Sequence, residues 1–177
     1  MPGVLPNREP DIKTHYLFPG TILVAREPYL VTTVLGSCVA VCIWHPKAGV
    51  GGINHYLLPL WNGEGLPTPK YGNIAIEKLI EKMESLGSKK SNMIAKVFGG
   101  GNIFESKLEQ FQIGERNIAI AKQVLEEHRI KIVGSSTGGN LGRKIQYLTS
   151  TGEVRQKMIE KKSREAESVV KMLNKFQ

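Results

Sequence analysis

The order of apolar and polar positions predicts a set of short β-strands near the start of the chain. Runs rich in β-branched residues at 22–26 and 30–34 are separated by a proline-containing turn and predict two strands. Two further runs, 38–44 and 49–58, flank a connector of hairpin length at 45–48. We therefore expect antiparallel pairing to begin early in the chain.

Helical periodicity appears only after a long loop. Residues 61–72 are rich in glycine and proline and predict that loop. The helix that follows carries an apolar stripe with spacings of three and four residues, formed by Ile76, Leu79, Ile80 and Met83. We expect Asn73 to cap its start and Gly87 to end it. A second helix is predicted at 115–128, from the same period.

The later strands indicate the fold class. Strands are predicted at 93–98 and 130–134, and a closing hairpin at 142–148 and 153–159 surrounds the turn at 149–152. Paired strands with few helices between them are typical of an α+β protein. We expect a layered sandwich of mixed or antiparallel β-sheet with helices packed on the outside.

One main domain suits a chain of 177 residues with 41% hydrophobic content. Residues 1–20 hold four prolines and no period, so we expect an irregular arm there, followed by a domain at 21–158. Residues 159–177 predict an amphipathic, basic C-terminal helix. Its apolar stripe is Val169, Met172, Leu173 and Phe176.

The charge pattern bears on location and partners. The net charge is +8, and residues 143–177 hold nine basic and four acidic side chains, which favours acidic partners. Nucleic acid is not expected, because no zinc-finger or aromatic RNA-binding pattern is present. The charged N-terminus does not resemble a signal peptide, and no apolar run is long enough to span a bilayer. We expect a cytoplasmic protein without membrane insertion.

The two cysteines, Cys38 and Cys42, are not expected to form a disulfide. In an extended strand they would lie about 13 Å apart, beyond the reach of a disulfide. Cysteine and histidine spacing does not match a metal site, so no metal is expected. The glycines at 99–101 lack the lysine of a phosphate-binding loop and predict a tight turn. Cys42 is interpreted as a core residue.

The hairpin places chemistry beside the first cysteine. If the connector closes symmetrically, Trp44 faces Gly49 and Cys38 lies directly opposite His55, close enough for a thiol and an imidazole to hydrogen-bond. A bulge at the glycines 51 and 52 would shift this register. A neighbouring imidazole lowers the pKa of a thiol and makes it a better nucleophile. From composition alone, however, a core cysteine and a satisfied histidine are the commoner interpretation.

Neighbouring residues supply candidates for supporting roles. Gly36 and Ser37 precede the cysteine and predict a turn whose N–H groups point at a developing oxyanion. The imidazole needs an acceptor on its other nitrogen, and the hydroxyls of Thr32 and Thr33 are the nearest by sequence.

Several blocks of this sequence resemble one family. The segment TTVLGSCVAVCIWHPKAGVGGINHYLLP at 32–59 closely resembles the active-site segment of the CheD family of bacterial chemoreceptor glutamine deamidases. KVFGGGNIF at 96–104, IGERN at 113–117 and TGGNLGRKIQYLTSTGEV at 137–154 are similar to its later blocks, in the same order. The resemblance covers about residues 21–158.

The resemblance implies a function and a set of site residues. The family's catalytic cysteine, histidine and threonine fall on Cys38, His55 and Thr32, while Thr33 is interpreted as an ordinary strand residue. The implied enzyme is a protein-glutamine glutaminase that needs no cofactor, acts through a cysteine thioester and has methylesterase action as a side activity. Ser136 departs from the acidic residue that the family commonly carries there.

The implied partners are the cytoplasmic region of methyl-accepting chemotaxis receptors and a CheC-like phosphatase. An alternative is a non-catalytic adaptor that regulates such a phosphatase and receptor signalling. A cysteine protease is a third interpretation, which the resemblance disfavours.

Overall fold

The computed structural model describes residues 11–103, 110–160, 171–172 and 175. The first five strands come early: β1 Lys13–Tyr16, β2 Ile22–Ala25, β3 Tyr29–Leu35, β4 Val39–His45 and β5 Val50–Asn54. Two helices and the strand between them follow: α1 Gly72–Ser85, the short 3₁₀ helix η1 Lys90–Asn92, β6 Ile94–Gly99 and α2 Gln110–Glu127. The last strands are β7 Lys131–Thr137, β8 Gly142–Leu148 and β9 Val154–Ile159.

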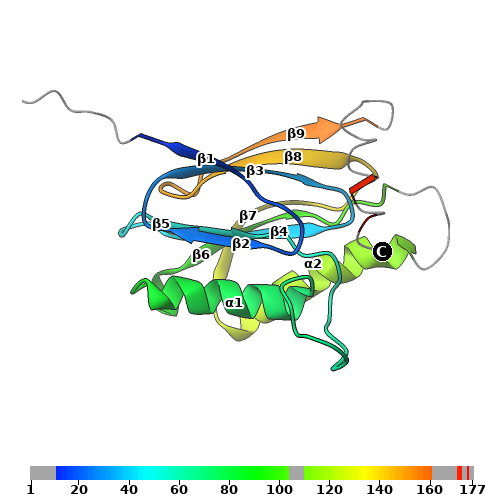
Figure 1. The fold of residues 1–177 in the computed structure, drawn as a ribbon, viewed down its shortest axis with the longest axis horizontal. Helices are drawn as coiled ribbons and strands as arrows, with labels where there is room; N and C mark the ends of the chain where they lie inside the picture. Colours follow the sequence, from blue (N-terminus) through cyan, green and yellow to red (C-terminus); the bar gives the residue numbers. More distant parts are fainter. Residues whose placement is uncertain (1–10, 104–109, 161–170, 173–174, 176–177) are drawn as a thin grey trace, which may run out of the picture.

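The described strands form two stacked sheets. One has the order β1-β3-β8-β9 and the other the order β2-β5-β4-β6-β7. Both sheets are mixed, because β1 pairs with β3 and β6 pairs with β7 in parallel while the other pairs are antiparallel. Helices α1 and α2 cover the outer face of the five-stranded sheet (Figure 1). The predicted α+β layered sandwich is confirmed.

Strand β4 separates two hydrophobic cores. Val39, Val41 and Ile43 pack toward the helices, in a core shared with Leu79 and Val124. Cys38, Ala40 and Cys42 face the opposite way, into the core between the two sheets. Because side chains alternate along a strand, both faces of β4 are buried. Cys42 is a fully buried core residue, as predicted.

Helix α1 has the predicted apolar stripe but not the predicted cap. Ile76 and Met83 are buried, and Gly87, with φ of 91°, follows the helix end as expected. The residue before the first turn is Tyr71, however, and Asn73 lies inside the helix. Its Oδ1 accepts a hydrogen bond from the Trp61 N–H at 3.0 Å, which ties the preceding loop to the helix.

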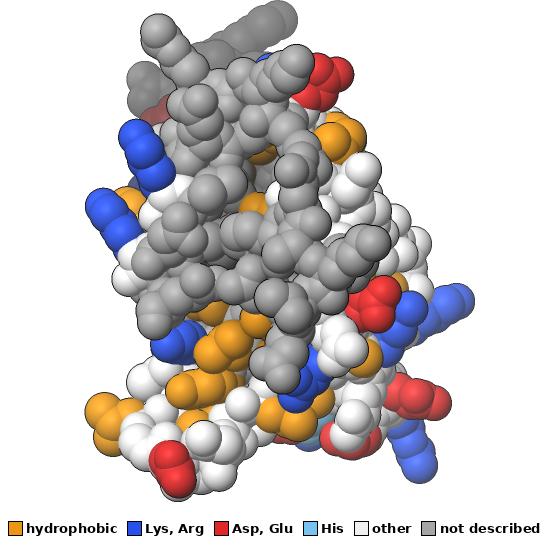
Figure 2. Space-filling view, turned by 90° about the vertical axis from the view of Figure 1, so that its right-hand side faces the viewer, with side chains coloured by type: hydrophobic (Ala, Val, Ile, Leu, Met, Phe, Trp, Pro, Cys, Tyr) orange, Lys and Arg blue, Asp and Glu red, His pale blue; other side chains and the backbone are white. Residues whose placement is uncertain are grey.

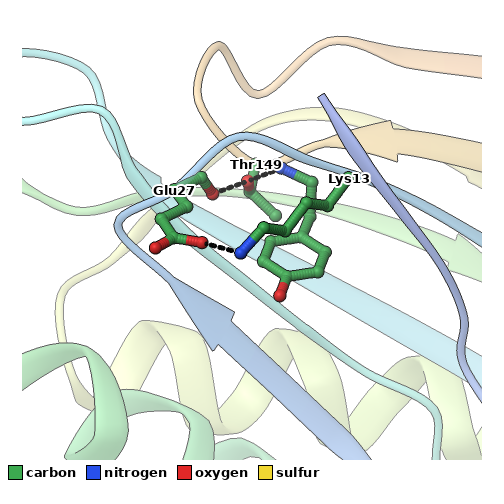
Figure 3. A network of polar contacts seen from close by, with 4 residues as sticks. Lys13, Glu27 and Thr149 are labelled. Carbon is green, nitrogen blue, oxygen red and sulfur yellow. Dashed lines mark hydrogen bonds and ion pairs between the residues drawn. The ribbon is translucent and has the colours of Figure 1, made fainter. Parts of the chain in front are cut away.

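The N-terminal arm contains a strand that the sequence did not predict. Strand β1 runs parallel to β3, and all four of its residues are exposed, so it lacks the alternation that marks a half-buried strand. Figure 3 shows the contacts at its start: Lys13 Nζ pairs with Glu27 Oε2 at 2.5 Å, and Thr149 Oγ1 donates to the Glu27 carbonyl at 3.2 Å. The strand is therefore held by its pairing with β3 and by the ion pair to Glu27, and not by burial of its own side chains.

The expected C-terminal helix falls mostly outside the described residues. Residues 171 and 172 are helical, and the positions 169, 173 and 176 of the predicted stripe are not described. Within the part of the chain that is described, no helix has the length and apolar character needed to cross a membrane.

Candidate active site

The β4–β5 hairpin has a different register from the one expected. Its bridges join His45 to Val50 and Trp44 to Gly51, so the connector is residues 46–49 and not 45–48. Gly49 adopts a φ of 65° and donates its N–H to the His45 carbonyl at 3.1 Å. A left-handed residue at the end of the turn is favourable for glycine, and this placement moves the pairing by one residue on each side.

The corrected register makes Cys38 and His55 diagonal neighbours. Val39 and Tyr56 form a bridge, donating backbone hydrogen bonds to each other at 3.1 and 3.0 Å. Cys38 is therefore opposite Leu57, and His55 lies one pair further along on the same face. Diagonal positions in an antiparallel pair are about 7–8 Å apart, within reach of a long side chain. The predicted direct opposition is wrong, but the shared face is retained.

His55 is held across the sandwich by Thr33. The hydroxyl of Thr33, on β3 of the other sheet, lies 2.7 Å from His55 Nδ1 and donates its own proton to the Leu17 carbonyl at 2.8 Å. A hydroxyl has only one proton to donate, so it accepts from Nδ1–H. His55 is therefore the tautomer that carries its proton on Nδ1, which leaves a lone pair on Nε2.

Thr32 does not take the place that the resemblance gave it. On β3 the buried side chains are those of Val31, Thr33 and Leu35, which point between the sheets. Thr32 is half-buried and faces the other side of the sheet. The acceptor that orients the imidazole in this structure is thus the neighbouring threonine, which sequence reasoning had treated as an ordinary strand residue.

Burial favours the neutral forms of both the imidazole and the thiol. Burial lowers the pKa of His55 to about 3 and raises that of the Cys38 thiol to about 12, while the backbone N–H of Cys38 acts in the opposite direction on the thiol. Nε2 of His55 has no hydrogen-bond partner among the described residues. The expected thiol–imidazole hydrogen bond is therefore not made in this structure, and the pKa of the thiol is raised and not lowered, because desolvation penalises the thiolate.

Carbonyl groups at and before Cys38 accept hydrogen bonds from the backbone of the glycine run at 99–101. Gly36 O accepts from the Gly101 N–H at 2.9 Å, and Cys38 O accepts from the Gly100 N–H at 2.8 Å. Gly99 must be glycine, since its φ is 107° and an added Cβ would lie 2.2 Å from Cys38 O. Gly99 ends β6 and no turn is assigned at Gly100 or Gly101, so the predicted tight turn is not found there. The close approach of the Gly99 backbone to the cysteine is what requires glycine.

The Ser37 carbonyl has a side-chain partner that sequence reasoning missed. Asn117 of α2, fully buried, donates from Nδ2 to Ser37 O and to Leu57 O, both at 2.9 Å. Asn117 belongs to the IGERN block, but its helical position resembled that of any polar residue. Among the described residues, neither the Ser37 nor the Cys38 N–H donates to a backbone carbonyl.

Ser136, the departure from the family pattern, lies against a buried arginine. Arg143 is 2% exposed and donates to the carbonyls of Ser136 and Gly138, and also to Ser136 Oγ at 3.2 Å. The Gly138 N–H in turn donates to Gly99 O at 3.0 Å. The serine therefore supports the loop that packs beside the glycine run.

Within the described residues, no three or more His, Cys, Asp or Glu side chains gather closely enough to hold a metal ion.

The fold and the site together define an α+β sandwich protein with a buried cysteine and a tautomer-fixed histidine on one inner sheet face. The family described as CheD chemotactic sensory transduction matches residues 57–158, a range that begins after His55. The chain belongs to the CheD family.

Curated relatives extend the similarity toward the N-terminus. The chain is 52% identical to "Probable chemoreceptor glutamine deamidase CheD" of Trichlorobacter lovleyi, covering 81% of this chain and 89% of the relative. It is 50% identical to the protein of the same name from Sulfurimonas denitrificans, over 85% of this chain and 97% of the relative. Among solved structures, Neisseria meningitidis protein NMB0706 overlaps 73% of this chain and 63% of its own, with a TM-score of 0.43 and 12% identity, too low to carry an argument.

Proposed function

We propose that this protein is a chemoreceptor glutamine deamidase that hydrolyses glutamine side-chain amides to glutamate and ammonia, with Cys38 as nucleophile and His55 as base. One observation carries the proposal: Thr33 fixes the tautomer of His55 and leaves its Nε2 lone pair without a partner on the face that also bears Cys38. A bare imidazole nitrogen beside a thiol is the pairing that nucleophilic cysteine catalysis needs. The relatives named as probable chemoreceptor glutamine deamidases support the same reaction.

The first half of the reaction forms a thioester. His55 Nε2 takes the thiol proton as the Cys38 sulfur bonds to the amide carbon, and the amide oxygen becomes an oxyanion held by the N–H groups of Ser37 and Cys38. The intermediate collapses when the carbon–nitrogen bond breaks, and His55 returns the proton to the leaving nitrogen, which departs as ammonia. The imidazole ends this half neutral, as it began.

The second half releases the glutamate. Nε2 removes a proton from a water molecule as its oxygen attacks the thioester carbon, and the carbon–sulfur bond breaks to leave a carboxyl group. The proton on His55 then returns to the Cys38 sulfur. These steps require no cofactor. The same thioester can form from a methyl ester with methanol as the leaving group, so we expect methylesterase action as a side activity.

Burial keeps both members of the pair neutral, because desolvation lowers the pKa of His55 to about 3 and raises that of the Cys38 thiol to about 12. These shifts oppose proton transfer from the thiol to the imidazole, so the proposed reaction requires the bound amide and the oxyanion donors to stabilise charge as the proton moves. A site closed to water also strengthens the pull of the two N–H groups on the oxyanion.

The loop between His55 and α1 has exposed apolar side chains, which suit a protein substrate. The connection between His55 and α1 exposes two large apolar side chains, Leu60 at 52% and Leu66 at 79%. Figure 2 shows apolar side chains gathered on the lower part of this end of the molecule. An exposed apolar patch surrounded by polar residues is typical of a protein-binding surface. The net charge of +8 adds attraction for an acidic receptor bundle.

A CheC-like phosphatase remains the second predicted partner, and a non-catalytic adaptor remains the alternative function. The two functions differ in their dependence on the thiol. If Cys38→Ala still supports receptor adaptation at the wild-type level, the adaptor function is correct and the enzyme function is wrong.

The direct test is mass spectrometry of a purified receptor cytoplasmic fragment incubated with the protein, with ammonia measured in parallel. We expect specific glutamine peptides to gain the mass difference between an amide and an acid, with one ammonia per event. Cys38→Ala and His55→Ala should be silent. Cys42→Ala is the matched control, because this second buried cysteine lies on the same strand face and should remain active. Equal activity of Cys38→Ala and wild type would refute the proposal.

A further inference from the structure

A single buried amide side chain joins the two halves of the candidate site. Asn117 Nδ2 donates one hydrogen bond to Ser37 O, next to the cysteine, and one to Leu57 O, two residues after the histidine. The backbone carbonyl of Asn117 also accepts the hydroxyl proton of Tyr56 at 2.5 Å. Helix α2 is thereby bonded to both segments through one residue.

The bond to Ser37 O sets the direction of the next N–H. The peptide unit between Ser37 and Cys38 is planar and trans, so its C=O and N–H point in opposite directions. Holding the carbonyl toward Asn117 therefore turns the Cys38 N–H away from α2. This N–H lies beside the sulfur of its own residue, where it favours negative charge.

The neighbouring peptides have the same arrangement. Gly36 O, Ser37 O and Cys38 O all accept hydrogen bonds, from Gly101, Asn117 and Gly100 respectively. The carbonyls of three successive residues are thus occupied, and the N–H groups of Ser37 and Cys38 are left unbonded to any carbonyl of the described chain. These two N–H groups are the donors on which the proposed oxyanion binding rests.

We propose that Asn117 is a positioning residue, which acts through the Ser37 carbonyl to aim the Cys38 N–H at the oxyanion formed on the amide carbon. This inference rests on the proposed deamidase reaction. Two of the three bonds that hold the turn come from backbone N–H groups of the glycine run, and Asn117 supplies the only side-chain donor among the described contacts of these three carbonyls.

The other side of the same amide supports a role beyond packing. Asn117 Oδ1 is buried and has no hydrogen-bond partner among the described residues. Burying an unsatisfied oxygen is unfavourable, and an apolar side chain of similar shape would avoid that penalty. An apolar replacement would, however, leave the carbonyls of Ser37 and Leu57 without their donor, so the two donated bonds are what the asparagine contributes here.

The test compares Asn117→Leu and Asn117→Asp with Val124→Ala, a matched control that loosens the core on the same helix without touching the turn. Each full-length variant is measured for kcat and KM on receptor glutamines and for alkylation of Cys38 by iodoacetamide, which displaces iodide and forms no oxyanion. We expect kcat of both Asn117 variants to fall about 10- to 100-fold, in keeping with a misdirected oxyanion donor. KM should stay within about twofold, and the alkylation rate should fall by much less than kcat, because alkylation depends on the thiolate but forms no oxyanion.

A pH profile keeps the proposal testable if Asn117→Leu fails to fold. A protonated carboxyl donates one hydrogen bond, so kcat of Asn117→Asp should rise relative to wild type as the pH falls. If kcat and alkylation fall together by the same factor, or if kcat is unchanged, Asn117 has no positioning role and only this inference fails. If wild-type protein is alkylated at Cys38 but releases no ammonia, the proposed function fails and this inference fails with it.

Discussion

Replacement of Thr33 by valine tests the geometry that orients His55. Valine keeps the shape of threonine and removes the hydroxyl, which accepts from His55 Nδ1 at 2.7 Å and donates to Leu17 O at 2.8 Å. All three groups are within the buried interior, so the change leaves a ring N–H and a carbonyl without partners. Each unsatisfied group costs about 1–3 kcal/mol, and after relaxation we expect Thr33→Val to lose about 2–4 kcal/mol of unfolding free energy.

The effect on activity follows from the tautomer. Without the hydroxyl, the bond that favours a proton on Nδ1 is lost, and the proton can move to Nε2, which is then no longer a base. An unpartnered Nδ1–H costs about 1–3 kcal/mol, and a proton that favours Nε2 by this amount lowers the fraction of His55 that can act as a base, and with it kcat/KM, by about 5- to 160-fold. Thr33→Ser keeps the hydroxyl and should stay within about threefold of wild type, apart from a small packing cost.

Thr32→Val is the decisive control, because the family resemblance assigned the orienting role to Thr32 and the structure places Thr33 at the imidazole. Glutamine deamidation should be near the wild-type rate in Thr32→Val. Ring ¹⁵N chemical shifts of His55 give a second measurement that does not depend on turnover, since they distinguish the two neutral tautomers. If Thr32→Val loses as much activity as Thr33→Val, or if wild-type His55 carries its proton on Nε2, the argument from Thr33 is refuted.

Three further predictions concern stability. Because the imidazole of His55 protonates only near pH 3 when folded and near its ordinary pKa of 6.5 when unfolded, the unfolded state binds more protons between these values. Unfolding free energy should therefore fall as the pH drops through this window, by up to about 1.4 kcal/mol per pH unit from this group. Urea titrations at several pH values should show that the unfolding free energy of His55→Gln depends less steeply on pH than that of the wild type. Gly99→Ala should lose about 3–5 kcal/mol, since its Cβ would meet a backbone carbonyl at 2.2 Å, whereas Gly139→Ala has open space, meets only the penalty of its positive φ and should lose about 1–2 kcal/mol. Thr149→Val removes two buried hydrogen bonds at the β2–β3 turn and should cost about 1–3 kcal/mol, whereas Lys13→Ala breaks an exposed ion pair and should leave the midpoint of thermal unfolding almost unchanged; equal shifts would contradict the reasoning.

The elements of the fold follow mainly from local patterns. The stripe through Ile76 and Met83 predicted α1, and the 142–159 hairpin formed as expected because its turn residues and alternation are local signals. The arm was predicted wrongly because β1 has no buried face, and Asn73 was predicted wrongly because the cap position is set by the path of the preceding loop. Long-range contacts therefore determined both the pairing of β1 and the start of α1.

The candidate site shows the same division. Sequence alone placed Cys38 and His55 on one face of the hairpin. The observed register moves the partner of each residue by two positions, and an even shift keeps every side chain on the same face, so this part of the prediction holds. Whether Thr32 or Thr33 contacts His55 depends on which face of β3 points across the sandwich toward the segment after β5. The local sequence around two adjacent threonines does not specify that face. The pKa shifts and the contact of Asn117 likewise arise from burial between layers that are distant in sequence. Local periodicity therefore determined most of the strands, the helices and the shared face of Cys38 and His55. The tertiary structure decided the pairing register, the hydroxyl that contacts His55 and the burial that shifts the pKa values of the candidate site.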